Sequence, residues 1–322
     1  MKKIFLFEPS IASNNIGDEI IVTSIKNEME EFFDKSFLVE MATHTPISNR
    51  YMYYLGVPDY KFILGSNIIV GSLIRFIHLR QWMLNIFTLH NLKNSIFIGV
   101  GAQRENIKID FFTKICYKFI FNKKFIHSVR DGYTEELLRR NGIHNILNTG
   151  CPTMWRFSEE FCSTIPKKKG EDVVFTLTDY KPDVVRDEHI ISTLKKNYKN
   201  VYFWPQGYKD MEYLNSLKNI ENISIVNPNT KSFEKLLSER DIDFVGTRLH
   251  GRIRALQLKK RTIIIAIDNR ARELYKDFNI PVLLKENIDE LEEMISKPLI
   301  TNIKLPVENI KTFTKQFNID YK

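Results

Sequence analysis

The chain has 322 residues, a hydrophobic content of 43%, a charged content of 27% and a formal net charge of +8. This length exceeds what one hydrophobic core usually serves, so we expect two domains, and the composition excludes a disordered or fibrous protein. Because no apolar run reaches about 18 residues, a transmembrane helix is excluded as well. The positive charge favours an anionic partner, and three cysteines without CxxC spacing predict a reduced cytoplasmic protein with no metal site.

The first predicted strand, residues 4–7, leads into a polar loop. This loop holds Asn15, Gly17 and Asp18 before a predicted helix over 19–33. Ligands of α/β domains bind outside the carboxyl ends of the strands, so these three residues are candidates for substrate binding. The alternative is a local role, in which the Asn and Asp side chains cap the helix and the glycine supplies the turn.

Residues 72–97 mix large apolar side chains with basic ones. Trp82 stands among several Leu, Ile and Phe residues, and Arg75 and Arg80 interrupt them. A basic amphipathic helix of this kind can lie in a membrane interface and be attracted to anionic lipid. An ordinary packed helix with a hydrated cationic face is the alternative.

Arg130 is the first basic residue that the pattern places at the end of a strand. It follows a predicted strand over 126–129 and precedes a predicted helix over 132–141. A guanidinium at this position can hold an anion, whereas the local alternative is an ion pair with Asp131 or Glu135. The predicted strands before it are 61–64 and 95–100.

In the second half of the chain, after a charged linker bounded by Pro and Gly, predicted strands again alternate with predicted helices. Strands are predicted over 172–177, 201–204, 223–226 and 243–246, and helices over 187–198, 210–217 and 232–239. Such alternation predicts a parallel sheet, and two domains of this type facing each other form an interdomain cleft, toward which Gln206 is expected to point. The expected organisation is an N-terminal domain 1–157, a linker 158–170, a C-terminal domain 171–287 and a tail 288–322.

The stretch 241–272 carries the strongest functional signal. It predicts a buried strand over 243–246, a turn over 247–251, a helix over 252–260 and a second buried strand over 262–267. Arg248, His250, Arg252 and Arg254 follow the first of these strands, where the N-terminus of a helix offers free N–H groups to an anion. Guanidinium groups bind phosphate or carboxylate, and an imidazole can move a proton near neutral pH. The alternative is a hydrated helix face with a turn histidine.

Four short motifs occur in a fixed order along the chain. They are NIGDE at 15–19, SVRD at 128–131, GCPT at 150–153 and TRLHG at 247–251. With this ordered set, the chain resembles the polysaccharide pyruvyl transferase family over residues 4–285, although it carries Gly-Ser-Asn at 65–67 where relatives often carry a run of glycines. The resemblance implies an α/β, GT-B-like architecture of two facing Rossmann-type domains. It also implies transfer of a pyruvyl group from phosphoenolpyruvate to a sugar, forming a cyclic ketal.

The resemblance also implies roles for individual residues. Arg130 and Arg248 would bind the donor and His250 would transfer the proton, with Leu249 and Asn269 as further substrate-binding candidates. The ordinary pKa of histidine, about 6.5, suits this task. Phosphoenolpyruvate would be a substrate, and no cofactor is expected.

The same resemblance implies an acceptor bound by the N-terminal domain and carried on polyprenyl diphosphate. The enzyme would then be cytoplasmic and peripheral on an anionic membrane. A nucleotide-sugar glycosyltransferase on the same GT-B frame is the alternative function. A nucleic-acid-binding protein is disfavoured because the basic residues are scattered and no stacking-aromatic motif accompanies them.

Overall fold

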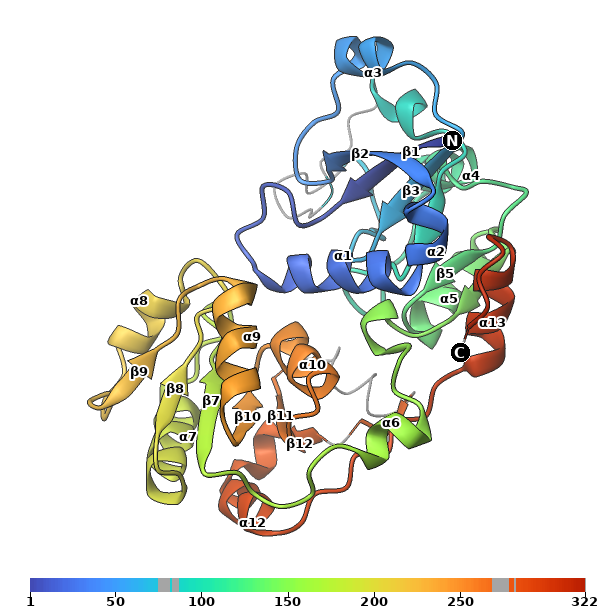
Figure 1. The fold of residues 1–322 in the computed structure, drawn as a ribbon. Coiled ribbons are helices and arrows are strands. Elements are labelled where there is room, and N and C mark those ends of the chain that lie inside the picture. The colour runs from blue at the N-terminus through green and yellow to red at the C-terminus, as the bar shows by residue number, and fades with distance from the viewer. Residues whose placement is uncertain (75–81, 83–86, 268–277, 281, 322) are drawn as a thin grey trace. The chain divides into compact units, whose positions relative to one another are not determined.

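The computed structural model describes residues 1–74, 82, 87–267, 278–280 and 282–321, and its chain divides into two compact units (Figure 1). The first unit comprises Met1–Ser13, Ile21–Trp155 and Leu305–Lys322, and the second comprises Asn14–Ile20 and Arg156–Lys304. These units depart from the expected boundaries in two places. The polar loop after the first strand belongs to the second unit, and the expected tail 288–322 is divided between the two units.

The first unit is built on a four-stranded parallel sheet in the order β2-β1-β3-β4. Its strands are β1 Lys2–Glu8, β2 Ser36–Ala42, β3 Tyr60–Leu64 and β4 Ile96–Ile98. Successive side chains of a strand point to opposite faces, so Phe5 of β1 enters one core cluster and Leu6 the other. A second parallel pair, β5 His127–Val129 and β6 Ile146–Asn148, is joined to the end of β4 by a bridge between Val100 and Val129.

Helices cover both faces of this first sheet. Residues of α1 Gly17–Glu28, α2 Glu30–Phe33 and α13 Val307–Lys315 pack in one core cluster, and residues of α4 Phe111–Ile120 and α5 Gly132–Arg140 pack in the other. The shorter elements are α3 Asn49–Leu55, η2 Leu89–Leu92 and η3 Pro152–Met154.

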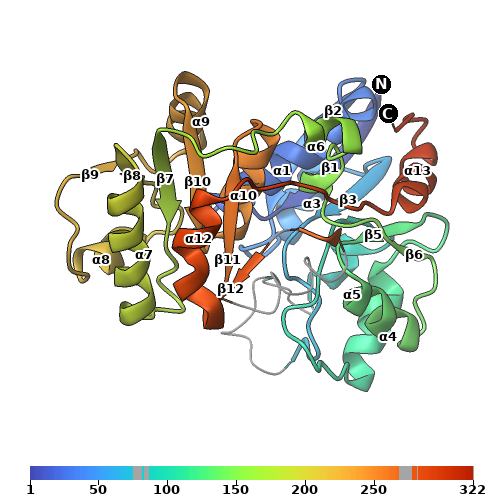
Figure 2. The same ribbon diagram turned by 90° about the horizontal axis from the view of Figure 1, so that it is seen from below.

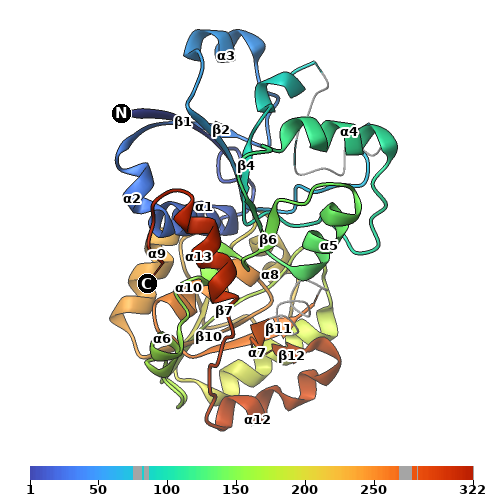
Figure 3. The ribbon, with the colours of Figure 1, turned by 90° about the vertical axis from the view of Figure 1, so that its right-hand side faces the viewer.

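The C-terminal segment completes the first unit. The Gln316 side chain accepts a hydrogen bond from the Ile126 N–H and donates one to the Ile126 carbonyl, both at 2.9 Å. Asn309 donates to the Asn148 carbonyl at the end of β6, and Figure 3 shows α13 beside that strand. These bonds explain why a segment without motifs belongs to a unit formed mostly by the first half of the chain.

The stretch 72–97 differs from a continuous amphipathic helix in its described part. Trp82 is buried and packs edge-on against Phe97 with 6.1 Å between ring centroids, so its ring lies in the core rather than on a lipid-facing surface. Arg75 and Arg80 lie outside the described residues. In the part of the chain that the model describes, we find no helix with the length and hydropathy needed to cross a bilayer.

The second unit contains a six-stranded sheet in the order β12-β11-β10-β7-β8-β9, and all its strand pairs are parallel. Its strands are β7 Asp172–Thr176, β8 Val201–Phe203, β9 Ile223–Ile225, β10 Ile242–Gly246, β11 Thr262–Ala266 and β12 Val282–Leu284. The predicted parallel sheet is therefore confirmed. The central strands β10, β7 and β8 are adjacent, so the loops that follow them meet at one edge.

Helices also lie on both faces of the second sheet (Figure 2). The helices are α6 Glu159–Ser163, α7 Val184–Asn197, α8 Asp210–Asn215, α9 Thr230–Glu239, α10 Leu249–Gln257, η4 Lys285–Glu290 and α12 Leu291–Ser296. Phe175 of β7 packs with residues of α7 and α12, and its neighbour Val174 packs with residues of α9 and α10. This two-sided burial explains the near-continuous apolar runs of the strands.

Candidate functional site

The candidate site lies at the carboxyl edge of the second sheet. β7 is followed by Asp179, β8 by Gln206, and β10 by Arg248. These three strands are neighbours and parallel, so side chains distant in sequence come within hydrogen-bond distance. The predicted convergence of ligand-facing residues at strand ends thus has a geometric basis here.

The helix after β10 begins earlier than predicted. Residues 247–251 were expected to form a turn, but α10 begins at Leu249 with Arg248 as its N-cap, so His250 lies in the first helical turn. Arg248 makes no side-chain capping hydrogen bond. The Gly251 N–H donates instead to Gln206 Oε1 at 3.0 Å, which satisfies one of the free N–H groups of that turn.

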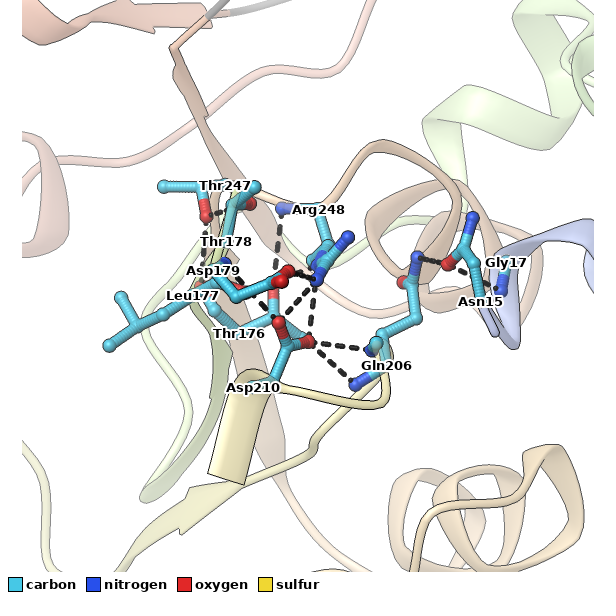
Figure 4. A network of polar contacts seen from close by, with 11 residues as sticks. Asn15, Gly17, Thr176, Leu177, Thr178, Asp179, Gln206, Asp210, Thr247 and Arg248 are labelled. Carbon is cyan, nitrogen blue, oxygen red and sulfur yellow. Dashed lines mark hydrogen bonds and ion pairs between the residues drawn. The ribbon is translucent and has the colours of Figure 1, made fainter. Parts of the chain in front are cut away.

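Arg248 is held by two carboxylates (Figure 4). Its Nε donates to Asp210 Oδ2 at 3.1 Å and to the Leu177 carbonyl at 3.2 Å, and its Nη2 donates to Asp179 Oδ1 at 2.6 Å and also to Asp210 Oδ1. The side chain of Asp210 is fully buried, whereas that of Asp179 is 24% exposed. Asp210 therefore fixes the guanidinium from the interior, and Asp179 contacts it from the accessible side.

Asp210 also orders the loop that precedes it. Its Oδ2 accepts hydrogen bonds from the N–H groups of Gln206 at 3.0 Å and Gly207 at 2.7 Å. Burial raises the pKa of this carboxyl above its ordinary value, while the Arg248 charge and the Gly207 N–H act in the opposite direction. A side chain on Gly207 would place its Cβ 2.2 Å from Arg248 Nη2, so this position needs glycine for the close approach.

The predicted residues of the first loop meet Gln206 in the second unit. Asn15 Oδ1 accepts hydrogen bonds from the Gly17 N–H at 3.1 Å and from Gln206 Nε2 at 3.0 Å. The Ile16 N–H donates to the Gln206 carbonyl at 2.9 Å. Both ends of the Gln206 side-chain amide are thus engaged within the fold, and the N–H that Asn15 accepts from is that of Gly17, the first residue of α1.

His250 lies beside the same loop. A Cβ built on Gly17 would lie 3.3 Å from His250 Cβ, so the two backbones are close. His250 and Asp18 are buried, and Leu249 is partly buried. The model therefore brings the NIGDE loop and the TRLHG segment together with Gln206. Asn269 lies outside the described residues.

The other basic residues of α10 do not form a single hydrated face. Arg252 is only 1% exposed, and Arg254 donates to Glu234 of α9 at 2.8 Å. The expectation that these two arginines gather with Arg248 and His250 at one anion site stays a prediction, and Arg254 is engaged by α9.

Arg130 belongs to the first unit, where it follows β5. Its Nε donates to Asp131 Oδ2 at 3.2 Å, which is one of the two local ion pairs considered from the sequence. Asp131 Oδ1 accepts from the Thr134 N–H and caps α5. The Arg130 side chain passes close to the backbone of Gly101, where a Cβ would lie 2.2 Å from Arg130 Nε.

Sequence reasoning missed Asp179 and Asp210. Asp179 follows the end of a predicted strand, as Arg248 does, and Asp210 begins the predicted helix after the next strand; these positions are the signal that could have found them. Their pairing with a residue 69 or 38 positions away depends on the strand order β10-β7-β8. Among the residues that the model places, no group of three or more His, Cys, Asp or Glu side chains could hold a metal ion.

The comparison with protein families gives one match. Residues 15–269 match the family model described as polysaccharide pyruvyl transferase. This range includes all four motifs and the site at the carboxyl edge of the second sheet. A comparison with curated protein sequences gives no match.

Solved structures with a similar fold include two proteins recorded with UDP. UDP-GlcNAc 2-epimerase of Methanocaldococcus jannaschii, in complex with UDP-GlcNAc and UDP, has a TM-score of 0.53 and 15% identity, with 98% of each chain covered. MnaA of S. aureus, in a structure with UDP, has a TM-score of 0.51 and 10% identity, covering 100% of this chain and 98% of that one. At these identities the likeness shows the fold alone, and the predicted GT-B-like α/β fold with parallel sheets is confirmed.

Proposed function

Because the chain belongs to the polysaccharide pyruvyl transferase family, we propose that it transfers a pyruvyl group from phosphoenolpyruvate to a sugar. The product is a cyclic ketal that bridges two hydroxyl groups of the acceptor. The observation that carries this proposal is that a fixed arginine, Arg248, and a histidine, His250, both lie at the strand end where α10 begins.

The reaction needs one acid and at least one cationic group. A proton adds to the methylene carbon of phosphoenolpyruvate and makes it a methyl group, and the adjacent carbon becomes electrophilic. One sugar hydroxyl attacks that carbon, phosphate leaves, and a second hydroxyl closes the ring. The two hydroxyl protons balance the proton on the methyl group and the proton that the released phosphate carries.

His250 is proposed as the group that delivers the first proton. It lies in the first turn of α10, directly after the N-cap Arg248 and Leu249, and we propose that an anion held by the guanidinium reaches the imidazole there. The loop that holds Gly17 runs beside this histidine, because a Cβ built on Gly17 would lie 3.3 Å from His250 Cβ.

Arg248 is proposed to hold the donor through the edge that its carboxylates leave available. Figure 4 shows Nη2 among the oxygens of Asp179 and Asp210 and the other terminal nitrogen directed away from them. A donor carboxylate or phosphate at that nitrogen would form a charge-assisted hydrogen bond without displacing Asp210. We propose Arg130 as a further donor-binding cation and the first unit as the acceptor side.

A nucleotide-sugar glycosyltransferase is the second candidate. The observation in its favour is that the two solved structures named above, which have a similar fold, are recorded with UDP. A nucleotide diphosphate would use the same helix N-terminus. Thermal-shift measurements separate the two: phosphoenolpyruvate stabilises the protein under the first proposal, and a UDP-sugar stabilises it under the second.

The direct test is mass spectrometry of saccharide acceptors incubated with phosphoenolpyruvate, including acceptors on polyprenyl diphosphate. We expect an added pyruvyl group and one released phosphate per product. His250→Ala should abolish turnover and leave the thermal unfolding of the protein close to that of the parent. His189→Ala, a histidine of α7 in the same unit, is the matched control and should turn over normally. Normal turnover by His250→Ala would refute its role in proton transfer.

A further inference from the structure

Helix α4 of the first unit is apolar on two sides. One side is anchored in the core, where Thr113, Cys116, Tyr117 and Ile120 are buried. The Tyr117 hydroxyl accepts a hydrogen bond from the Val70 N–H at 2.8 Å and donates to the Val70 carbonyl at 3.0 Å. These contacts fix the helix, and so they also fix the direction of its other side.

The other side presents four large apolar side chains to solvent. Phe111 is 80% exposed, Ile115 51%, and Phe112 and Phe119 are each 37% exposed. At 3.6 residues per turn these four positions share a sector of about 100°. Contiguous exposed apolar side chains of this size mark an interaction surface, because burying them elsewhere is favourable.

Lysines border this apolar sector. Lys114 and Lys118 follow on one side of it by the same helical spacing, and Lys93 Nζ lies 5.4 Å from the centroid of the Phe119 ring. The segment 111–124 contains four lysines and no acidic residue. Asp110, just before the helix, accepts a hydrogen bond from the Thr113 N–H as its cap. The surface therefore combines aromatic rings with positive charge.

We propose that this face of α4 docks the protein on an anionic lipid bilayer. Aromatic and aliphatic side chains enter the boundary between headgroups and acyl chains, and the bordering lysines pair with anionic headgroups. Ten residues of helix measure about 15 Å, half the thickness of the hydrocarbon core, so α4 lies in the interface and does not span it.

Charge favours lipid over a second copy of the chain. In a two-fold contact that pairs α4 antiparallel with its copy, the lysine edges of the two helices would lie side by side and repel each other. An anionic bilayer instead supplies the opposite charge along the whole face. This docking surface does not depend on the proposed reaction, and it differs from the stretch 72–97 that the sequence suggested for membrane contact.

Sedimentation with vesicles tests the proposal. The parent protein should sediment with vesicles of phosphatidylcholine mixed with phosphatidylglycerol, remain in the supernatant with phosphatidylcholine alone, and dissociate as salt is raised. Phe111→Ser/Ile115→Ser should weaken binding on the order of a hundredfold, because two apolar side chains no longer enter the bilayer. Val184→Ser/Val185→Ser, an exposed apolar pair on α7 of the second unit, is the matched control and should bind like the parent.

A second pair of variants tests the charged border. Lys114→Gln/Lys118→Gln should weaken binding about thirtyfold. Lys231→Gln/Lys235→Gln, at the same spacing on α9 of the second unit, should change it little. Thermal unfolding of each variant should match that of the parent, because none of the replaced side chains is buried.

Three outcomes would overturn the proposal. The parent could remain in the supernatant with both kinds of vesicle, or Phe111→Ser/Ile115→Ser could sediment as the parent does. The third outcome would come from light scattering of the protein without vesicles, which measures its oligomeric state. A parent that is dimeric and becomes monomeric in that serine variant, without binding vesicles, would make this face a contact between copies of the chain.

Discussion

The carboxyl ends of the parallel strands place their charges in different ways in the two units. At the edge of the second sheet, Arg248 donates hydrogen bonds to Asp179, Asp210 and a backbone carbonyl. At the edge of the first unit, Arg130 contacts the carboxylate of its chain neighbour Asp131 through one nitrogen. Both arginines follow a strand, but Arg248 is fixed by residues from two other loops, whereas Arg130 is held locally.

The difference teaches how each edge balances its charge. In the second unit, one cation is matched by two carboxylates inside the fold, and the fixed geometry suits orientation of a bound group. In the first unit, Glu8 at the end of β1 is buried beside another carboxyl, that of Glu40, and shares a hydrogen bond with it. At the second edge an arginine balances two carboxylates, whereas in the first unit burial beside Glu40 favours the protonated form of Glu8.

The largest expected effect is on the stability of the second edge. Asp210→Ala should lower the free energy of unfolding by about 3–5 kcal/mol, because it leaves the buried Arg248 with one partly exposed carboxylate and a backbone carbonyl as partners. Asp131→Ala, the matching change at Arg130, should cost only about 1 kcal/mol, mainly for the lost cap of α5. Urea unfolding measures both. Equal costs would contradict the contrast between a fixed and a locally held arginine.

The pH dependence of stability is the next largest effect, and it belongs to the first edge. Burial raises the pKa of Glu8 to about 7 from an ordinary value of 4.5; a hydrogen bond with Glu40 also raises it, and Lys26 opposes the shift. The folded state holds the Glu8 proton more tightly than the unfolded state does. The contribution of this proton to the free energy of unfolding is therefore complete below about pH 4.5. It is lost as the pH rises through about 7, and its full size is about 3 kcal/mol.

Glu8→Gln should remove this pH dependence because glutamine carries no proton that titrates. Urea unfolding at about pH 5 and about pH 8 gives the difference for parent and variant. Glu31→Gln, an exposed position on α2 of the same unit, is the control and should keep the parent's difference. A parent whose stability is the same at both pH values would show that Glu8 is ionised throughout.

The sequence predicted most strands but not the contacts that set the site. Buried strands such as β7 and β10 were readable because both faces are covered, which produces continuous apolar runs. β2 was missed because it is partly exposed and carries Phe37 on the solvent side, so no clear alternation marks it. The expected helix over 19–33 is divided into α1 and α2 at Met29.

The predicted start of α10, at residue 252, was wrong for a different reason. Helix starts are predicted from Ser, Thr, Asp or Asn at the N-cap position, and the N-cap of α10 is an arginine, Arg248. The acceptor for the Gly251 N–H is Gln206, 45 residues earlier, and only the strand order brings it there. In the same way, the sequence showed the GCPT motif but not what packs against it. Gly99, with a φ of +64°, contacts Pro152 of this motif, and a Cβ on Gly99 would lie 2.3 Å from the proline ring.

A third prediction concerns donor binding at the locally held arginine. Arg130→Ala should weaken phosphoenolpyruvate binding by about 2 kcal/mol, roughly thirtyfold, with little change in the free energy of unfolding. Arg130→Lys should recover only part of the affinity because it cannot form a bidentate pair. Arg140→Ala, an exposed arginine of α5 paired with Glu136, is the control and should bind normally. Titration calorimetry gives the affinities, and parent-like binding by Arg130→Ala would place the donor elsewhere.

The smallest effect separates the two carboxylates that hold Arg248. Asp179 contacts the guanidinium from the accessible side, so its negative charge repels any anion that approaches Arg248, whereas Asp210 orients the guanidinium from the interior. Asp179→Asn keeps the shape of the side chain and removes the charge. It should therefore strengthen phosphoenolpyruvate binding by about 1 kcal/mol, roughly fivefold, and the gain should shrink as salt is raised. Asp289→Asn, which makes the same change in net charge at an exposed position of the second unit, should leave the affinity unchanged. If Asp179→Asn weakens binding instead, Asp179 orients Arg248 as Asp210 does, and both acids belong to one rigid support for the guanidinium.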